Sequence, residues 1–124
     1  MHAASELTGA RVLVVEDEFL ISLEVQADLA EAGAQVVGPS ATIEGALDLV
    51  RQETLSAAIV DFRLGRDTIV PILRELSARA VPFVLYTGLG ETGSIRKEWP
   101  RCKIVTKPAS PAVLIGAVSD LLQR

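Results

Sequence analysis

Five short apolar runs, each followed by a longer segment of mixed residues, set the strongest limit on how this chain can fold. The runs cover residues 11–15, 35–38, 57–61, 82–86 and 103–106. Apolar residues at helical spacing predict helices over 18–32, 41–53, 67–79 and 111–123, with a weaker one near 92–98. Strands that alternate with helices in this way favour a parallel sheet with helices on both faces. The sequence therefore predicts an α/β fold.

Residues at the ends of these segments agree with the prediction. Gly33 follows the first predicted helix, where glycine often ends a helix. Ser40 and Ser110 can cap the second and last helices, and Pro111 suits a first helical turn. Three glycines between residues 88 and 93 each weaken a helix by roughly 1 kcal/mol. We therefore expect the helix near 92–98 to be short or mobile.

Length and composition exclude several classes of protein. The chain has 124 residues, which suits one domain, and it is 49% apolar and 23% charged. Its net charge is -4 and it has no basic run with interleaved aromatics, so we expect no nucleic-acid partner. No apolar run approaches the roughly 18 residues of a membrane span. The sequence thus predicts a soluble protein with no membrane partner.

Cysteine and histidine are nearly absent. The lone Cys102 excludes an internal disulfide and favours a reducing, cytoplasmic location. The one histidine, His2, falls in residues 1–10, which we expect to form a flexible N-terminal tail ahead of a domain over 11–124. Histidine-based nucleophilic catalysis inside the fold is therefore excluded.

Acidic residues follow two of the predicted strands. Glu16 and Asp17 come directly after the first strand, and Asp61 ends the third. With strand order 2-1-3-4-5, these two strands are neighbours, and their carboxyl ends border the crevice where such sheets bind ligands. Two carboxylates about 4 Å apart repel by about 4 kcal/mol at an effective dielectric of about 20. A magnesium ion, which prefers oxygen ligands, would relieve that repulsion.

A simpler interpretation of the first acids stays open. Residues 16–18 could be solvated acids that open a helix, where the helix dipole favours negative charge. Asp61 shifts the balance, because an acid at the end of a fully apolar strand is costly without partners or a function.

Two more strand ends carry polar side chains. Thr87 ends the fourth predicted strand, and Lys107 follows the fifth. Carboxylates for a metal ion, one carboxylate nucleophile, a hydroxyl donor and an ammonium are the groups needed to place a phosphoryl group on Asp61. Tyr86, next to Thr87, could face either the core or the surface, and the sequence does not decide.

The motifs VVEDE, IVDFRL, LYTG and TKP together resemble the receiver domain of two-component response regulators. The resemblance covers the chain after about the first ten residues and implies a flavodoxin-like fold of five βα units. It implies that Asp61 is the phosphoacceptor and that Thr87 and Lys107 assist it. It further implies that Mg²⁺ is held by Glu16, Asp17, Asp61 and the backbone carbonyl of Arg63.

By the same resemblance, the chain accepts a phosphoryl group from a partner phosphohistidine and changes its contacts with a downstream protein. It would be a cytoplasmic signalling protein whose only catalysis is its own phosphorylation and dephosphorylation. Two alternatives stay open: an interaction module that works without phosphorylation, and a small Mg²⁺-dependent aspartyl-phosphate hydrolase. Arg63 disfavours the hydrolase, because such enzymes normally carry a second acid two residues after the nucleophile.

The chain departs from the family pattern at the residue three before the lysine. Ile104 stands where the family usually has Tyr or Phe, so an inward swing of that ring cannot operate here. Phe83 and the pair Thr87–Gly88 are similar to the PFxFATG motif of single-domain receivers in alphaproteobacteria, with Tyr86 in place of alanine.

The first and last predicted helices carry more apolar residues than one core face needs. In the first, Phe19, Leu20, Leu23, Ala27 and Ala30 are expected to face the core, while Ile21, Val25 and Leu29 form a second stripe. That stripe either packs on the sheet or last helix, or docks a histidine kinase or phosphotransfer protein. In the last helix, the expected core face is Val113, Leu114, Ala117, Val118 and Leu121, with Ile115 and Leu122 beside it. Both helices could also support a weak homodimer.

Overall fold

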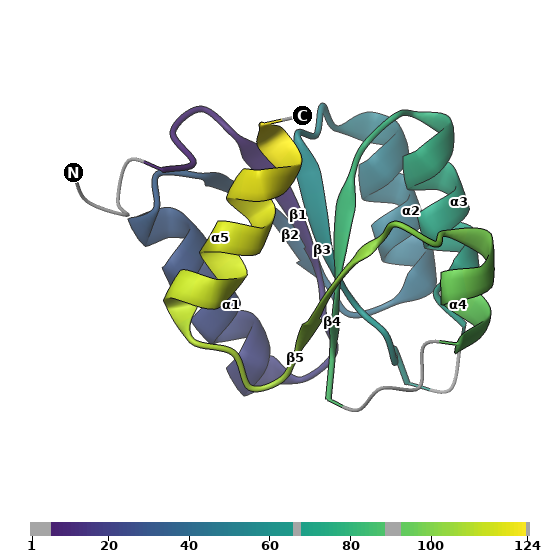
Figure 1. Cartoon of the computed structure of the whole chain (residues 1–124). Helices are drawn as coiled ribbons and strands as arrows, with labels where there is room; N and C mark the ends of the chain where they lie inside the picture. Colours follow the sequence, from purple (N-terminus) through teal and green to yellow (C-terminus); the bar gives the residue numbers. More distant parts are fainter. Residues whose placement is uncertain (1–5, 66–67, 89–92, 124) are drawn as a thin grey trace.

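The computed structural model describes residues 6–65, 68–88 and 93–123, and it contains one parallel sheet. The strands are β1 (Arg11–Val15), β2 (Gln35–Ser40), β3 (Ala57–Asp61), β4 (Phe83–Thr87) and β5 (Lys103–Thr106). The helices are α1 (Phe19–Glu31), α2 (Ile43–Gln52), α3 (Val70–Ala78), α4 (Gly93–Glu98) and α5 (Pro111–Leu122). The strand order is β2-β1-β3-β4-β5 (Figure 1), which confirms the predicted flavodoxin-like fold.

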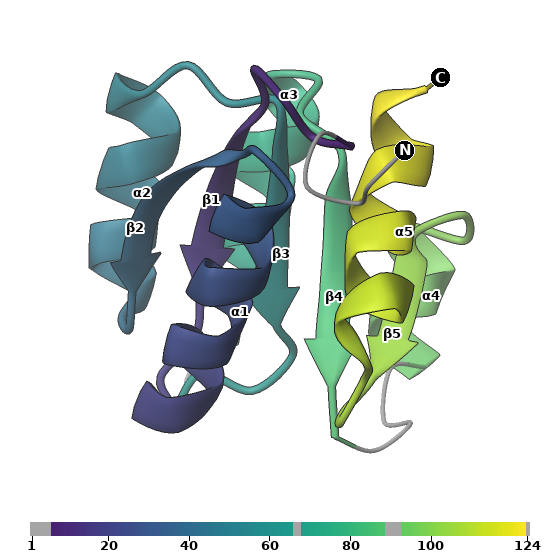
Figure 2. The same ribbon diagram turned by 90° about the vertical axis from the view of Figure 1, so that its left-hand side faces the viewer.

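Helices cover both faces of the sheet, with α1 and α5 on one side and α2, α3 and α4 on the other (Figure 2). Successive side chains of a strand point to opposite faces, so each strand contributes to both cores. In β1, Val12 and Val14 join the core under α1 and α5, while Leu13 and Val15 join the core under α2 and α3. Helices therefore bury both faces of the sheet.

An irregularity in β2 fixes where β1 ends. The pairing of β1 with β2 shifts between Leu13 and Val15, so that Val15 pairs with Ser40. Gly38 in this stretch has φ +88°, and a Cβ there would lie 3.1 Å from the Val14 carbonyl oxygen. The shift lets the Glu16 N–H donate to the Ser40 carbonyl at 2.9 Å. The backbone of the first acidic residue is thereby anchored.

Most of the predicted helix ends are confirmed. Gly33 follows α1 with φ +93°, and the Ser110 hydroxyl caps α5 by accepting a hydrogen bond from the Val113 N–H. The predicted cap of α2 was wrong: Thr42 accepts from the Gly45 N–H at 3.0 Å, because Ser40 is still part of β2. Helix α4 is short, with six residues.

The face that α1 turns to the core is the opposite of the predicted one. Ser22, Val25 and Leu29 are buried, whereas Phe19 and Leu20 are each 73% exposed. The remaining members of the predicted core stripe, Leu23, Ala27 and Ala30, are also exposed.

Contacts with α5 explain this orientation. Val25 and Leu29 pack in the same core as Leu114 and Val118 of α5, and Ile21 packs against that core. Of the two interpretations left open for the second stripe, packing on the last helix is the one that holds. Val25 and Leu29 are therefore not a docking surface.

Helix α5 buries a slightly rotated face. Leu114, Ala117, Val118 and Leu121 are buried as predicted. Ile115 is buried as well, although it was expected beside the core, and Val113 is 55% exposed, although it was expected inside it.

The described part of the expected N-terminal tail packs on the fold. Leu7 is 1% exposed, and its N–H donates to the Ala32 carbonyl at 2.8 Å just after α1. Residues 1–5 lie outside the described residues. No helix within 6–65, 68–88 or 93–123 has the length and apolar character needed to cross a membrane.

The burial of α1 gives a test with two identical substitutions on one helix. Leu29→Ala should lower the free energy of unfolding by about 2–5 kcal/mol, because it leaves a cavity in a fully buried position. Leu20→Ala should change it by less than about 0.5 kcal/mol, because Leu20 is largely exposed. Urea unfolding of both variants measures the difference; equal losses would contradict the observed orientation of α1.

Candidate functional site

The predicted polar residues come together at one edge of the sheet. Asp61 and Thr87 are the last residues of β3 and β4, while Glu16 and Lys107 directly follow β1 and β5. Asp61, Thr87 and Lys107 border a cavity of about 370 Å³. Its lining consists of Asp17, Glu18, Asp61, Arg63, Gly65, Thr87, Gly88 and Lys107. Parallel strands explain the convergence, because their carboxyl ends share one edge.

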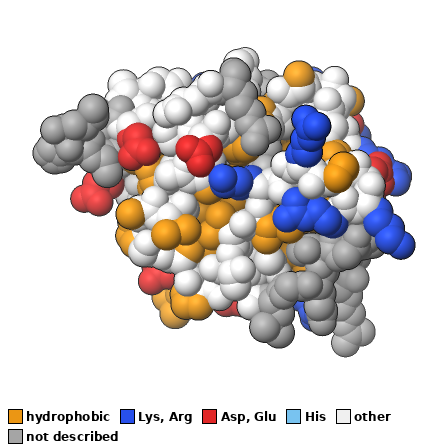
Figure 3. Space-filling view, in the orientation of Figure 1, with side chains coloured by type: hydrophobic (Ala, Val, Ile, Leu, Met, Phe, Trp, Pro, Cys, Tyr) orange, Lys and Arg blue, Asp and Glu red, His pale blue; other side chains and the backbone are white. Residues whose placement is uncertain are grey.

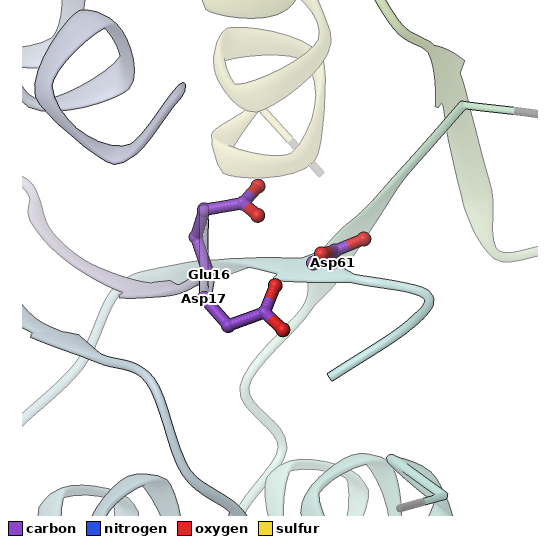
Figure 4. A group of neighbouring side chains, drawn as sticks. All are labelled: Glu16, Asp17 and Asp61. Carbon is purple, nitrogen blue, oxygen red and sulfur yellow. The ribbon is translucent and has the colours of Figure 1, made fainter. Parts of the chain in front are cut away.

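Three carboxylates form the acidic part of the site. Glu16, Asp17 and Asp61 each offer an oxygen that lies within 4.8 Å of the other two. Figure 4 shows that the first two come from the end of β1 and the third from the adjacent end of β3. Glu16 and Asp61 are only 4% and 6% exposed, whereas Asp17 is exposed. The group therefore combines two buried charges with one that faces solvent.

The Lys107 ammonium compensates the two buried charges. Its Nζ lies 3.0 Å from Glu16 Oε1 and 3.3 Å from Asp61 Oδ1. Its side chain is 12% exposed. Burial alone would lower the pKa of Lys107, but the carboxylates of Glu16 and Asp61 outweigh burial and raise it. The ammonium is therefore held in its charged form between two strands.

The surroundings favour the neutral form of Glu16, whereas they favour the charged form of Lys107. Burial, followed by the nearby Asp61 carboxylate, raises the pKa of Glu16 from its usual 4.5 to about 7, although Lys107 favours the charged form. One ammonium shared between two buried carboxylates does not fully stabilise both negative charges.

Backbone amides hold each carboxylate in place. The Glu18 N–H donates to Glu16 Oε2 at 3.1 Å, and the Gly65 N–H donates to Asp17 Oδ2 at 2.9 Å. The Arg63 N–H donates to Asp61 Oδ1 at 3.2 Å. These contacts tie the loop after β3 to both acidic strand ends.

Thr87 and Lys107 are joined through the backbone. Thr87 is 3% exposed, and its carbonyl accepts a hydrogen bond from the Lys107 N–H at 2.7 Å. The end of β4 thus fixes the residue that carries the ammonium.

Tyr86 is the residue at this site that the sequence left undecided. It is 6% exposed, and its ring centroid lies 5.4 Å from Lys107 Nζ. Its hydroxyl accepts a hydrogen bond from the Ala109 N–H at 3.2 Å. Its place in the site could have been predicted only from the strand register, because Tyr86 pairs directly with Asp61 across β3 and β4.

The carboxylates fit a hard divalent cation. All the side-chain donors in the group are oxygens, and Mg²⁺ typically binds one or two carboxylates together with water and phosphate oxygens. The exposed Asp17 carboxylate borders the cavity, so an ion there would remain accessible to a phosphorylated ligand.

Comparison with known proteins gives consistent relatives. No protein-family profile matches the chain. It is 26% identical over 117 residues to the transcriptional regulatory protein PdtaR of two Mycobacterium tuberculosis strains. The alignment covers 92% of the chain but 57% of PdtaR, so the chain spans little more than half the length of these curated relatives.

Solved structures of response regulators share the fold. The receiver protein from Sinorhizobium medicae gives a TM-score of 0.82 at 24% identity over 92% of this chain and 94% of that one. The response regulator PhyR from Brucella abortus gives 0.83 at 26% identity, over 98% of this chain and 51% of that one. The receiver domain of the Pseudomonas aeruginosa sensor kinase PA1611, described with magnesium in its active-site cleft, gives 0.80 at 22% identity over 94% of this chain and 100% of that one.

The raised pKa of Glu16 predicts how stability depends on pH. Between about pH 4.5 and 7 the unfolded chain releases this proton while the folded chain keeps it. The free energy of unfolding should therefore fall as pH rises through that window, by on the order of 1–3 kcal/mol.

Urea unfolding from pH 5 to 7.5 without divalent cations measures this effect. Glu16→Gln should remove this contribution to the pH slope, while Glu18→Gln, which changes an exposed neighbour, should keep it. The same slope in all three proteins would show that Glu16 does not titrate in this range.

Proposed function

We propose that this chain is a response regulator receiver domain, and that it accepts a phosphoryl group on Asp61 from a phosphohistidine of a partner protein in a two-component pathway of the cytoplasm. The observation that carries the proposal is the Lys107 ammonium, held at 3.0 Å from Glu16 and 3.3 Å from Asp61 beside an open cavity. A buried cation that already contacts the nucleophile suits a reaction that adds negative charge there.

In the proposed reaction, a carboxylate oxygen of Asp61 attacks phosphorus and forms a P–O bond. The P–N bond to the donor histidine breaks, and its electron pair stays on the imidazole nitrogen. Lys107 offsets the negative charge that arrives, and the Thr87 hydroxyl donates to a phosphoryl oxygen. Dephosphorylation is a separate step: a water molecule attacks phosphorus and loses a proton to solvent, the P–O bond to Asp61 breaks with its electron pair on the carboxylate, and inorganic phosphate leaves.

Glu16, Asp17 and Asp61 would hold the Mg²⁺ ion, together with the backbone carbonyl of Arg63. When bound, the ion supplies charge neutralisation for the phosphoryl oxygens. The magnesium ion described in the cleft of the PA1611 receiver domain supports this assignment. The protein's own contribution is to hold two carboxylates rigidly by the amides of Glu18 and Arg63.

The donor would dock on the first turns of α1. Phe19, Leu20 and Leu23 are exposed large apolar side chains in the first turns after the acidic residues at the end of β1. These three replace the stripe of Ile21, Val25 and Leu29 in that role, because Val25 and Leu29 are buried. A donor protein seated there would bring its phosphohistidine to the mouth of the cavity.

The downstream partner, or a weakly bound second copy, would use the side of the molecule formed by β5 and α5. Hydrophobic side chains are visible over this region in the space-filling view (Figure 3). A shallow groove there is bordered by Val113 and Gly116 of α5 and by Ile104 of β5.

Phosphorylation itself is the first test. Incubation with phosphoramidate or acetyl phosphate and Mg²⁺ should add one phosphoryl group to the wild-type chain, visible as a mass increase. Asp61→Asn should abolish the increase, because an amide is not a nucleophile for phosphorus, while Asp48→Asn on α2 should leave it unchanged. An unmodified wild type, or a labelled Asp61→Asn variant, would overturn the proposal and favour a module that works without phosphorylation.

The docking surface is tested by comparing donors. Leu20→Ala should slow transfer from a phosphorylated histidine phosphotransfer protein by about fivefold or more, since truncating a residue that anchors an interface costs more than about 1 kcal/mol of binding. The rate with phosphoramidate should stay the same, because that donor needs no docking. Equal rates with the protein donor would remove α1 from the docking surface.

A further inference from the structure

Lys107 reaches the two carboxylates by passing over a neighbouring strand. It follows β5, whereas its partners Glu16 and Asp61 belong to the ends of β1 and β3, and β4 lies between β3 and β5. The residue of β4 on this path is Tyr86. In the sheet register Tyr86 pairs with Asp61 on one side and with Val105 on the other.

The Tyr86 ring lies under the ammonium. Register partners in a parallel sheet point to the same face, so the ring shares its face with the Asp61 carboxylate. Lys107 Nζ is 5.4 Å from the ring centroid, within the range of a cation–π contact. The ammonium therefore contacts three groups: the Tyr86 ring, the Glu16 carboxylate after β1 and the Asp61 carboxylate at the end of β3.

The Tyr86 hydroxyl holds the backbone that follows Lys107. Pro108 has no N–H, so the first amide after Lys107 that can donate is that of Ala109. This amide donates to the Tyr86 hydroxyl at 3.2 Å. On the other side, the N–H of Lys107 itself donates to the Thr87 carbonyl at 2.7 Å. Tyr86 and Thr87, which are adjacent in β4, thus hold the backbone at Ala109 and at Lys107.

A lysine needs this support more than most charged residues. Its ammonium is a point charge on a flexible four-carbon stem, and its hydrogen bonds do not impose one orientation. Tyr86 is 6% exposed and the Lys107 side chain 12% exposed, so ring and stem are packed together away from solvent.

We propose that Tyr86 is a positioning residue that holds the Lys107 ammonium between Glu16 and Asp61, with its ring under Nζ and its hydroxyl on the Ala109 amide. The inference rests on the proposed function for what the held ammonium does, which is to stabilise the phosphoryl group on Asp61. Without the ring and the hydroxyl, Lys107 would spend less time in contact with that group.

Two substitutions separate the contributions. Tyr86→Phe keeps the ring and removes the hydroxyl, and it should slow phosphorylation by saturating phosphoramidate about threefold. Tyr86→Leu removes both and should slow it about tenfold or more. Phe83→Leu is the matched control, because it removes a buried ring from the same strand on the opposite face, where it contacts Trp99 instead of Lys107. It should leave the rate unchanged even if it lowers stability.

A double-mutant comparison shows whether Tyr86 acts through the lysine. In a Lys107→Ala background, Tyr86→Leu should have no further effect on the phosphorylation rate, because the group that it positions is already missing. A tenfold loss in both backgrounds, or a Tyr86→Leu variant as fast as the wild type, would overturn the inference.

A structural measurement keeps this inference separate from the proposed function. Exchange of the Ala109 amide proton should be slow in the wild type and markedly faster in Tyr86→Phe, whether or not the chain is phosphorylated. Unchanged exchange would contradict the positioning role. A wild type that takes no phosphate while Ala109 still responds to Tyr86→Phe would reject the proposed function and leave the positioning contact supported.

Discussion

One ammonium group between two buried carboxylates is the interaction on which the polar end of this molecule depends. Glu16 and Asp61 lie at the ends of neighbouring strands and are almost fully buried. Uncompensated, they would repel each other in a medium that screens charge poorly. Lys107 contacts both, and it joins the ends of β1, β3 and β5 in one network. Removing one member of a buried ionic group leaves the others without a partner, so these three residues function as a unit.

Much of this end of the molecule could be predicted because parallel strands impose it. Once Asp61, Thr87 and Lys107 are assigned to strand ends, the topology brings them to one edge without any knowledge of side-chain packing. Strand β3 follows the same logic: its uninterrupted apolar run indicates burial on both faces, and the structure buries every residue of it. The boundaries of β1, β3 and β5 agree with those predicted from the sequence.

Packing decided the features that the sequence did not predict. Helix α1 carries two apolar stripes, so residue type alone did not identify its buried face. The packing of Val25 and Leu29 in one core with α5 identifies it. Tyr86 was ambiguous for a related reason. Both faces of β4 are buried, and alternation therefore gives no sign of which side a residue takes. Its place beside Lys107 depends on the register of three strands, which is a property of the assembled sheet.

The surroundings of Trp99 have a practical consequence for spectroscopy. This residue is the only tryptophan of the chain. Its indole N–H donates to Ser77 Oγ at 2.9 Å, and its ring meets Phe83 edge-on with centroids 6.1 Å apart. Phe83 begins β4 and Thr87 ends it, so the fluorophore is separated from the acidic cavity by about 13 Å of strand. Emission from this indole therefore reports the packing of the α3–β4 corner, and it provides an optical signal for unfolding at a point remote from the carboxylates.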